Sequence, residues 1–61
     1  MDQDYNFNTL KGLIEEDTFD DSNRPFAFHY YLGYIHGLYL ADGISSSQKE
    51  ELRELLNKRR K

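Results

Sequence analysis

The sequence predicts an all-α fold, in the form of a small domain of three helices. In three stretches of the chain, apolar residues recur at three- and four-residue steps, which is the period of one helix face. No stretch alternates polar and apolar residues over the length of a strand, and no tight turn joins two β-branched runs. We expect helices over about residues 7–16, 24–41 and 46–59.

The first predicted helix has a single apolar face, and Asn6 or Asn8 is a suitable N-cap. Its apolar face consists of Phe7, Leu10, Leu13 and Ile14. The short polar residues of DTFDDSN then end the helical period and indicate a loop, with Phe19 as its apolar anchor. Residues 1–5 precede the pattern, and we expect them to be a frayed end.

The second predicted helix begins near Arg24 or Pro25, after a cap at Ser22 or Asn23. Proline suits the first turn of a helix, because its missing N–H would have no partner there anyway. We expect this helix to run to residue 41. Gly43 should then adopt the left-handed conformation that closes many helices.

The third predicted helix follows three serines. Ser45 with Gln48, or Ser47 with Glu50, has the spacing of a capping box, in which each side chain bonds the backbone N–H of the other residue. Its apolar stripe is narrow and consists of Leu52, Leu55 and Leu56. A short connection predicts that the second and third helices form a hairpin, with residues 60–61 frayed.

Length and composition limit the size of the core. The chain of 61 residues forms one domain over 1–61, and such a chain buries only about 60% of the surface that its unfolded form exposes. Cysteine is absent, so no disulfide compensates, and self-association is one remaining source of stability. The acidic start lacks the pattern of a secretory signal. The most apolar run is shorter than the ~20 residues that cross a bilayer, and we expect a cytoplasmic protein without membrane contact.

The central helix is apolar nearly all round, which is typical of a helix with neighbours on every side. The two flanking helices have apolar stripes too narrow to cover it. We therefore predict that it associates with a second copy, forming a homodimer, or with a larger protein partner. The residues expected to make this contact are Tyr30, Tyr31, Gly33, Tyr34, Gly37 and Leu38. Tyrosines are common binding anchors, and small residues allow another backbone to approach.

His29 and His36 do not predict a metal site. They lie two helical turns apart, about 10.5 Å, whereas two ligands of one ion on a helix must be three or four residues apart. A site across a dimer would need ligands from another copy, and a pH-dependent role of the histidines stays open. The chain has no Gly-rich phosphate loop, and the adjacent Glu15 and Glu16 point in different directions on a helix. We expect no catalytic residue, cofactor, metal or small-molecule substrate.

Charge is distributed unevenly along the chain. Residues 1–24 carry seven acids and two bases, and residues 48–61 carry three acids and six bases, within a net charge of −3. The acidic patch consists of Glu15, Glu16, Asp17, Asp20 and Asp21, and the basic tail of Lys58, Arg59, Arg60 and Lys61. We predict a non-enzymatic regulator or inhibitor that acts by protein contact. Two alternatives are a nucleic-acid-binding accessory protein that uses the basic tail, and an acidic mimic that occupies a basic groove.

Overall fold

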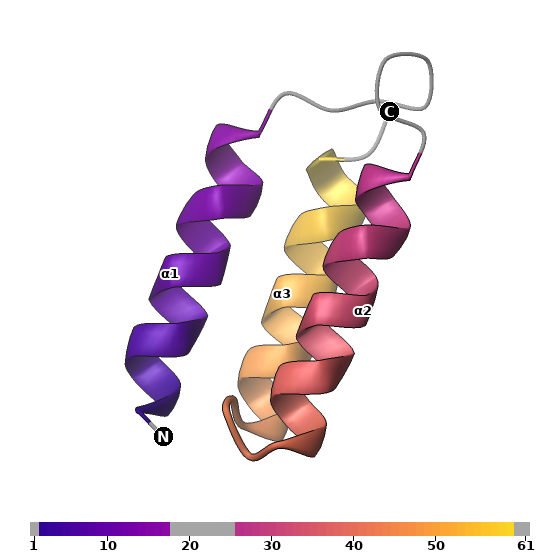
Figure 1. Cartoon of the computed structure of the whole chain (residues 1–61). Coiled ribbons are helices and arrows are strands. Elements are labelled where there is room, and N and C mark those ends of the chain that lie inside the picture. Colours follow the sequence, from indigo (N-terminus) through magenta and orange to yellow (C-terminus); the bar gives the residue numbers. More distant parts are fainter. Residues whose placement is uncertain (1, 18–25, 60–61) are drawn as a thin grey trace.

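A computed structural model of the chain, which describes residues 2–17 and 26–59, confirms the all-α fold. Its three helices are α1 (Gln3–Glu16), α2 (Ala27–Leu40) and α3 (Ser46–Arg59). The helices run side by side, and α2 is antiparallel to the other two (Figure 1). The predicted hairpin of α2 and α3 is therefore present.

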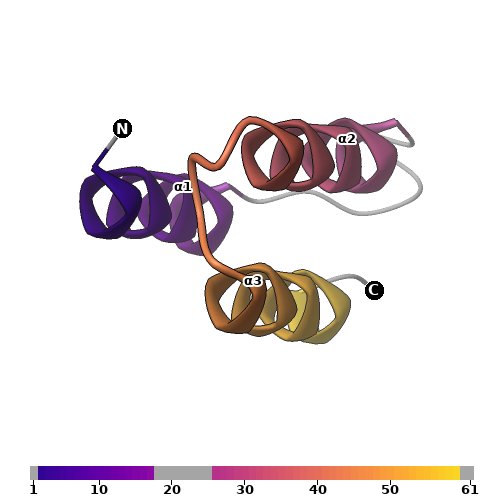
Figure 2. The ribbon, with the colours of Figure 1, turned by 90° about the horizontal axis from the view of Figure 1, so that it is seen from below.

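The three helices do not pack equally on one another. α3 packs against both α1 and α2, whereas α1 and α2 contact each other much less. Figure 2 shows this arrangement from one end, with α1 and α2 side by side and α3 against both. The molecule consequently has one face that α1 and α2 form together, on the side away from α3.

The core lies where α1 and α2 pack against α3. Its buried residues come from all three helices and from the connection between α2 and α3: Leu10, Ile14, Ala27, Phe28, Tyr31, Ile35, Ile44, Leu52 and Leu56. The partly buried residues Phe7, Leu32, Leu38, Tyr39 and Leu55 pack around them. Full burial of one such aliphatic side chain stabilises the fold by roughly 1.5–3 kcal/mol.

α1 begins earlier than the sequence pattern predicts, at Gln3 rather than residue 7. Asp2 is the N-cap, and its carboxylate accepts the backbone N–H of Tyr5 at 3.0 Å. An aspartate cap satisfies a free N–H of the first turn, so residues 3–5 are helical and not frayed. Asn6 lies inside the helix, and its side-chain amide donates to the backbone oxygen of Gly43 at 2.9 Å. This bond ties α1 to the hairpin.

α2 ends at Leu40 through a two-bond Schellman motif. The N–H of Gly43 donates to the oxygen of Leu38 at 2.6 Å, and that of Asp42 donates to Tyr39 at 3.1 Å. Asp42 has the left-handed conformation, with a φ of 60°. The prediction that Gly43 adopts it is wrong, because Ala41 is the C-cap and the left-handed position is the next one. The predicted start at 24–25 is wrong, because α2 begins at Ala27 with Phe26 as its N-cap, and Phe26 makes no side-chain cap hydrogen bond. The predicted caps Ser22 and Asn23 lie outside the described residues.

α3 begins with one of the two predicted capping boxes. The N–H of Gln48 donates to Ser45 Oγ at 3.1 Å, and the N–H of Ser45 donates to Gln48 Oε1 at 2.9 Å. The Gln48 amide also donates to the Asp4 carboxylate of α1 at 2.9 Å. The capping box thus fixes the start of α3 and joins it to α1.

Candidate protein-binding face

α2 has four buried residues on one side and seven exposed residues on the other. Its core-facing residues are Ala27, Phe28, Tyr31 and Ile35. Its exposed residues are His29, Tyr30, Gly33, Tyr34, His36, Gly37 and Leu40, and Phe26 before the helix is exposed too. No aspartate, glutamate, lysine or arginine occurs anywhere in α2. We call this exposed, uncharged side of α2, together with Phe26, the α2 face.

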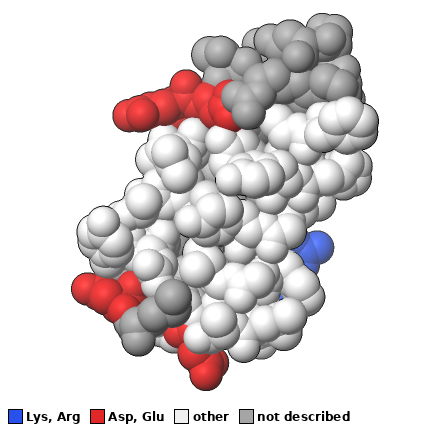
Figure 3. All heavy atoms as spheres, in the orientation of Figure 1, with Lys and Arg blue, Asp and Glu red and all other residues white. Residues whose placement is uncertain are grey.

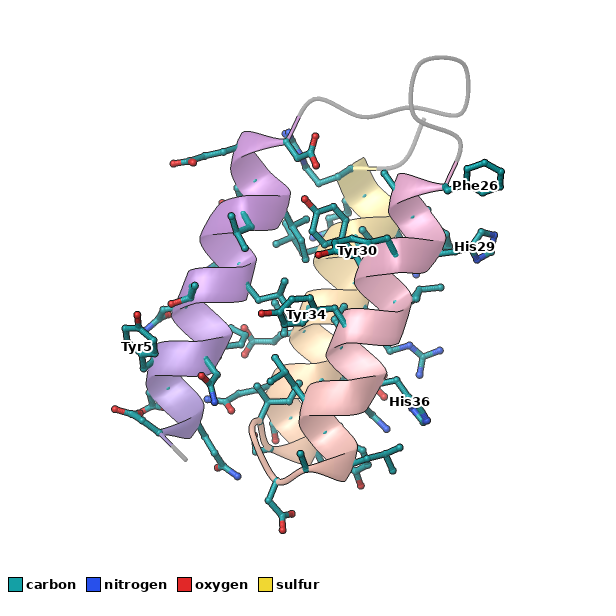
Figure 4. The ribbon with its side chains drawn as sticks, viewed as in Figure 1. Tyr5, Phe26, His29, Tyr30, Tyr34 and His36 are labelled. Carbon is teal, nitrogen blue, oxygen red and sulfur yellow. The ribbon has the colours of Figure 1, made fainter. Side chains whose placement is uncertain are left out.

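Tyr30 and Tyr34 form an aromatic ridge along one edge of the α2 face. Their side chains are 61% and 43% exposed, and their rings meet edge to face with centroids 6.2 Å apart. Both rings extend from α2 toward the α1 side of the molecule (Figure 4). Two exposed rings that orient each other present a fixed aromatic surface, which suits contact with another protein.

His29 and His36 lie on the other edge of the α2 face, with Phe26 near its upper end (Figure 4). Gly33 and Gly37 fall between the two edges at 100° per residue. A Cβ added at either glycine would have no atom of a neighbouring segment within 4 Å. The close approach that these glycines predict is therefore not made within the part of the chain that the structure describes, and the α2 backbone is accessible along this line.

Two of the predicted contact residues are not at the surface as expected. Tyr31 is only 6% exposed and belongs to the core, and its hydroxyl donates to the Asp17 carboxylate at 2.6 Å. Tyr31 is thus a core residue and is not accessible to a partner. Leu38 is half-buried against the core and contributes only its outer part. Of the predicted set, Tyr30, Gly33, Tyr34 and Gly37 form the exposed surface.

The predicted acidic patch is smaller than expected at the surface. Glu15 and Glu16 are exposed at the end of α1, but Asp17 is half-buried and bonded to Tyr31. Asp20 and Asp21 lie outside the described residues. In Figure 3, acidic side chains lie near both ends of the α1–α2 side of the molecule, and the surface between them is uncharged apart from a basic side chain at the right edge of the view.

The basic tail is partly engaged inside the chain. The Arg59 guanidinium donates to the backbone oxygen of Asp17 at 2.8 Å, which links the ends of α1 and α3. Lys58 is exposed, and Arg60 and Lys61 lie outside the described residues. Lys58 is therefore the described tail residue whose charge faces solvent.

A hollow of about 270 Å³ lies between α2 and α3, and sequence reasoning missed it. It is lined by Leu32, Ile35 and His36 from α2, and by Lys49 and Arg53 from α3. The four-residue spacing of Lys49 and Arg53 was the available signal, because it puts both cations on one side of α3. Only the packing of α3 on α2 brings them to His36.

Within residues 2–17 and 26–59, no three side chains of the metal-binding types lie close enough to share an ion. His29 and His36 are both exposed. None of the described helices combines the length and the apolar character needed to cross a membrane. Comparison of the chain with protein-family models, curated proteins and solved structures gives no match.

Proposed function

We propose that this chain is a non-enzymatic protein-binding module, which regulates or inhibits a larger protein through the α2 face. The observation that carries the proposal is the chemistry of that face. Surface helices usually place charged residues on their solvent side, but the solvent side of α2 carries aromatic, histidine, leucine and glycine residues instead.

The exposed apolar area is large enough to matter for binding. Phe26, Tyr30, Tyr34 and Leu40 are 80%, 61%, 43% and 69% exposed. If each such side chain offers roughly 200 Å², they expose about 500 Å² in all. This area, distributed along the length of α2, is more than half of the ~800 Å² that one partner contributes to a standard interface.

The two central glycines support the same proposal. Each glycine inside a helix costs about 1 kcal/mol relative to alanine. Since nothing in the described chain approaches Gly33 or Gly37, no contact there offsets that cost. A partner whose backbone packs directly on α2 would make use of both residues.

A different protein fits the α2 face better than a second copy of this chain. Acidic side chains lie near both ends of the α1–α2 side (Figure 3), so a two-fold dimer that buries this side with its axis across the helices would place acidic ends of the two copies opposite each other. Such like-charge contacts oppose association. We therefore propose a partner with an apolar surface, and treat the homodimer as the competing outcome.

The two alternative functions have less support. Nucleic-acid binding would use the basic tail, but Arg59 is already bonded to the backbone of Asp17. The acidic mimic would use the acidic patch, but the Asp17 carboxylate is bonded to Tyr31. In each case part of the predicted charge has a structural use instead.

Capture from a native extract tests the proposal, using immobilised chain and two variants. The double variant Tyr30→Ala/Tyr34→Ala removes the aromatic ridge. Tyr5→Ala is its matched control, because Tyr5 is 67% exposed but points away from α2 on the far side of α1 (Figure 4). We expect a protein that the wild type and Tyr5→Ala retain and the double variant releases. Equal retention by all three chains would refute the α2 face as the binding surface.

Light scattering separates the homodimer from a larger partner. We expect the wild-type chain to be monomeric at micromolar concentration. A dimer that Tyr30→Ala/Tyr34→Ala dissociates, and Tyr5→Ala does not, would identify a second copy as the occupant of the α2 face.

A further inference from the structure

We propose that the hollow between α2 and α3 binds a carboxylate carried on a short hydrocarbon chain. This site is independent of the proposed function, because free carboxylic acids can be titrated into the isolated chain. It lies between two helices, and its lining combines three nitrogen bases with two aliphatic side chains.

The histidine, lysine and arginine side chains of the lining favour binding of an anion. His36 approaches from α2, and Lys49 and Arg53 approach from α3, and none of the described residues that line the hollow is acidic. The Lys49 side chain is only 22% exposed, and its ammonium lies 4.1 Å from the centre of the Tyr39 ring. That contact holds one cation in place. The planar guanidinium of Arg53 can donate two parallel hydrogen bonds to a carboxylate.

The aliphatic side chains favour a ligand with a hydrocarbon part. Ile35 is 1% exposed and Leu32 is half-buried, and both contribute to the lining. The volume of about 270 Å³ is just below the ~300 Å³ at which small-molecule pockets begin. A chain of a few methylene groups would fill it. Inorganic phosphate has no apolar part and would leave the aliphatic lining uncovered.

Among residues 2–17 and 26–59, Glu50 is the acidic residue whose carboxylate lies near these cations. Its Oε1 lies 3.6 Å from Arg53 Nη1 and 4.0 Å from Lys49 Nζ. A ligand carboxylate must therefore compete with the Glu50 side chain. Removing the Glu50 charge should strengthen ligand binding, whereas removing the Arg53 charge should weaken it.

NMR titration of the full chain with acetate, butyrate, hexanoate and inorganic phosphate tests the site. We expect millimolar binding that shifts the signals of Leu32, Ile35, His36 and Arg53, and that tightens by about two- to fourfold per added methylene group. Phosphate should bind more weakly than butyrate. Equal binding of acetate and hexanoate, or phosphate binding as tight as that of hexanoate, would overturn the proposal.

Charge-matched variants locate the binding. Arg53→Gln should weaken hexanoate binding about fivefold, and Glu50→Gln should strengthen it. Lys58→Gln and Glu51→Gln make the same charge changes on the opposite side of α3, and should leave the affinity unchanged. A loss with Lys58→Gln equal to that with Arg53→Gln would show a general charge effect and overturn the site.

A fifth ligand distinguishes the two sources of such a carboxylate. N-acetylglutamate amide presents the side-chain carboxylate of a protein, and hexanoate presents a free acid. Tighter binding of the glutamate derivative supports a partner's side chain as the source, and tighter binding of hexanoate supports a small acid. Absence of binding by both would overturn the proposal.

Discussion

α2 and α3 are antiparallel neighbours with 14 residues each, and they pack on each other along their length. Half of the residues of α3 are charged, whereas α2 has no charged residue. Both helices nevertheless bury the same kind of side chain. Ile35 of α2 and Leu52 of α3 are 1% and 0% exposed. The two helices differ on their solvent sides.

This difference shows which features of the two helices folding requires: the buried apolar side is common to both, and the composition of the solvent side is not. A buried aliphatic face is enough to hold either helix in place, and α3 shows that the other side can then be charged. On the uncharged side of α2, no other described segment of the chain packs against Gly33 or Gly37. The three-helix fold therefore does not require glycine at these two positions. We infer that the exposed side of α2 serves binding as well as folding. Substitutions in the shared buried faces and on the exposed sides test this difference between α2 and α3.

The largest expected effect concerns the shared buried faces. Ile35→Ala and Leu52→Ala should each destabilise the fold by about 3 kcal/mol, because each leaves a cavity in a closed core. Urea unfolding followed by circular dichroism measures both. A loss of about 3 kcal/mol in one variant and below about 1 kcal/mol in the other would show that the two helices do not contribute equally to the core.

An effect of about 1 kcal/mol is expected at the start of α3. Ser45→Ala removes the hydroxyl that accepts the Gln48 N–H, and should lower the free energy of unfolding by that amount. Ser47→Ala is the matched control, because Ser47 belongs to the capping box that did not form and is exposed. Equal losses from the two serines in urea unfolding would contradict the observed cap.

A smaller effect of opposite sign is expected on the α2 face. Gly33→Ala should stabilise the isolated chain by about 0.5–1 kcal/mol, because alanine favours the helix and its Cβ would meet no other segment. The same substitution should weaken capture of the partner if its backbone packs on this line. A destabilised Gly33→Ala chain would reveal an intramolecular contact at this position and remove one support of the proposed function.

The sequence predicts much of this fold because the period of its apolar residues marks three helices, and Ser45 with Gln48 marks one helix start. The sequence does not predict the start of α1, because Asp2 lies in a polar stretch without the apolar period that marks a helix. Residue type alone favours Gly43 for the left-handed position. Asp42 has this conformation because the last helical turn ends one residue earlier.

The candidate surfaces were harder to predict than the helices. α2 is apolar on nearly every side, and the polar sector that His29 and His36 mark is too narrow to reveal which of the other residues face the core. Tyr30 and Tyr31 are adjacent and identical in type, yet one is 61% exposed and the other 6%. The position of α3 decides between them. The hollow of Lys49, Arg53 and His36 likewise depends on two helices meeting, which no local pattern encodes.

Site-specific photo-crosslinking tests the central claim most directly. The photo-reactive residue benzoylphenylalanine replaces Tyr34 on the α2 face, Tyr5 on the far side of α1, or Glu51 on the charged side of α3, and each chain is irradiated in native extract. If the α2 face is the binding surface, we expect one discrete adduct from position 34 and none from positions 5 and 51. The same adduct from all three positions, or an adduct from position 5 or 51 alone, would contradict it.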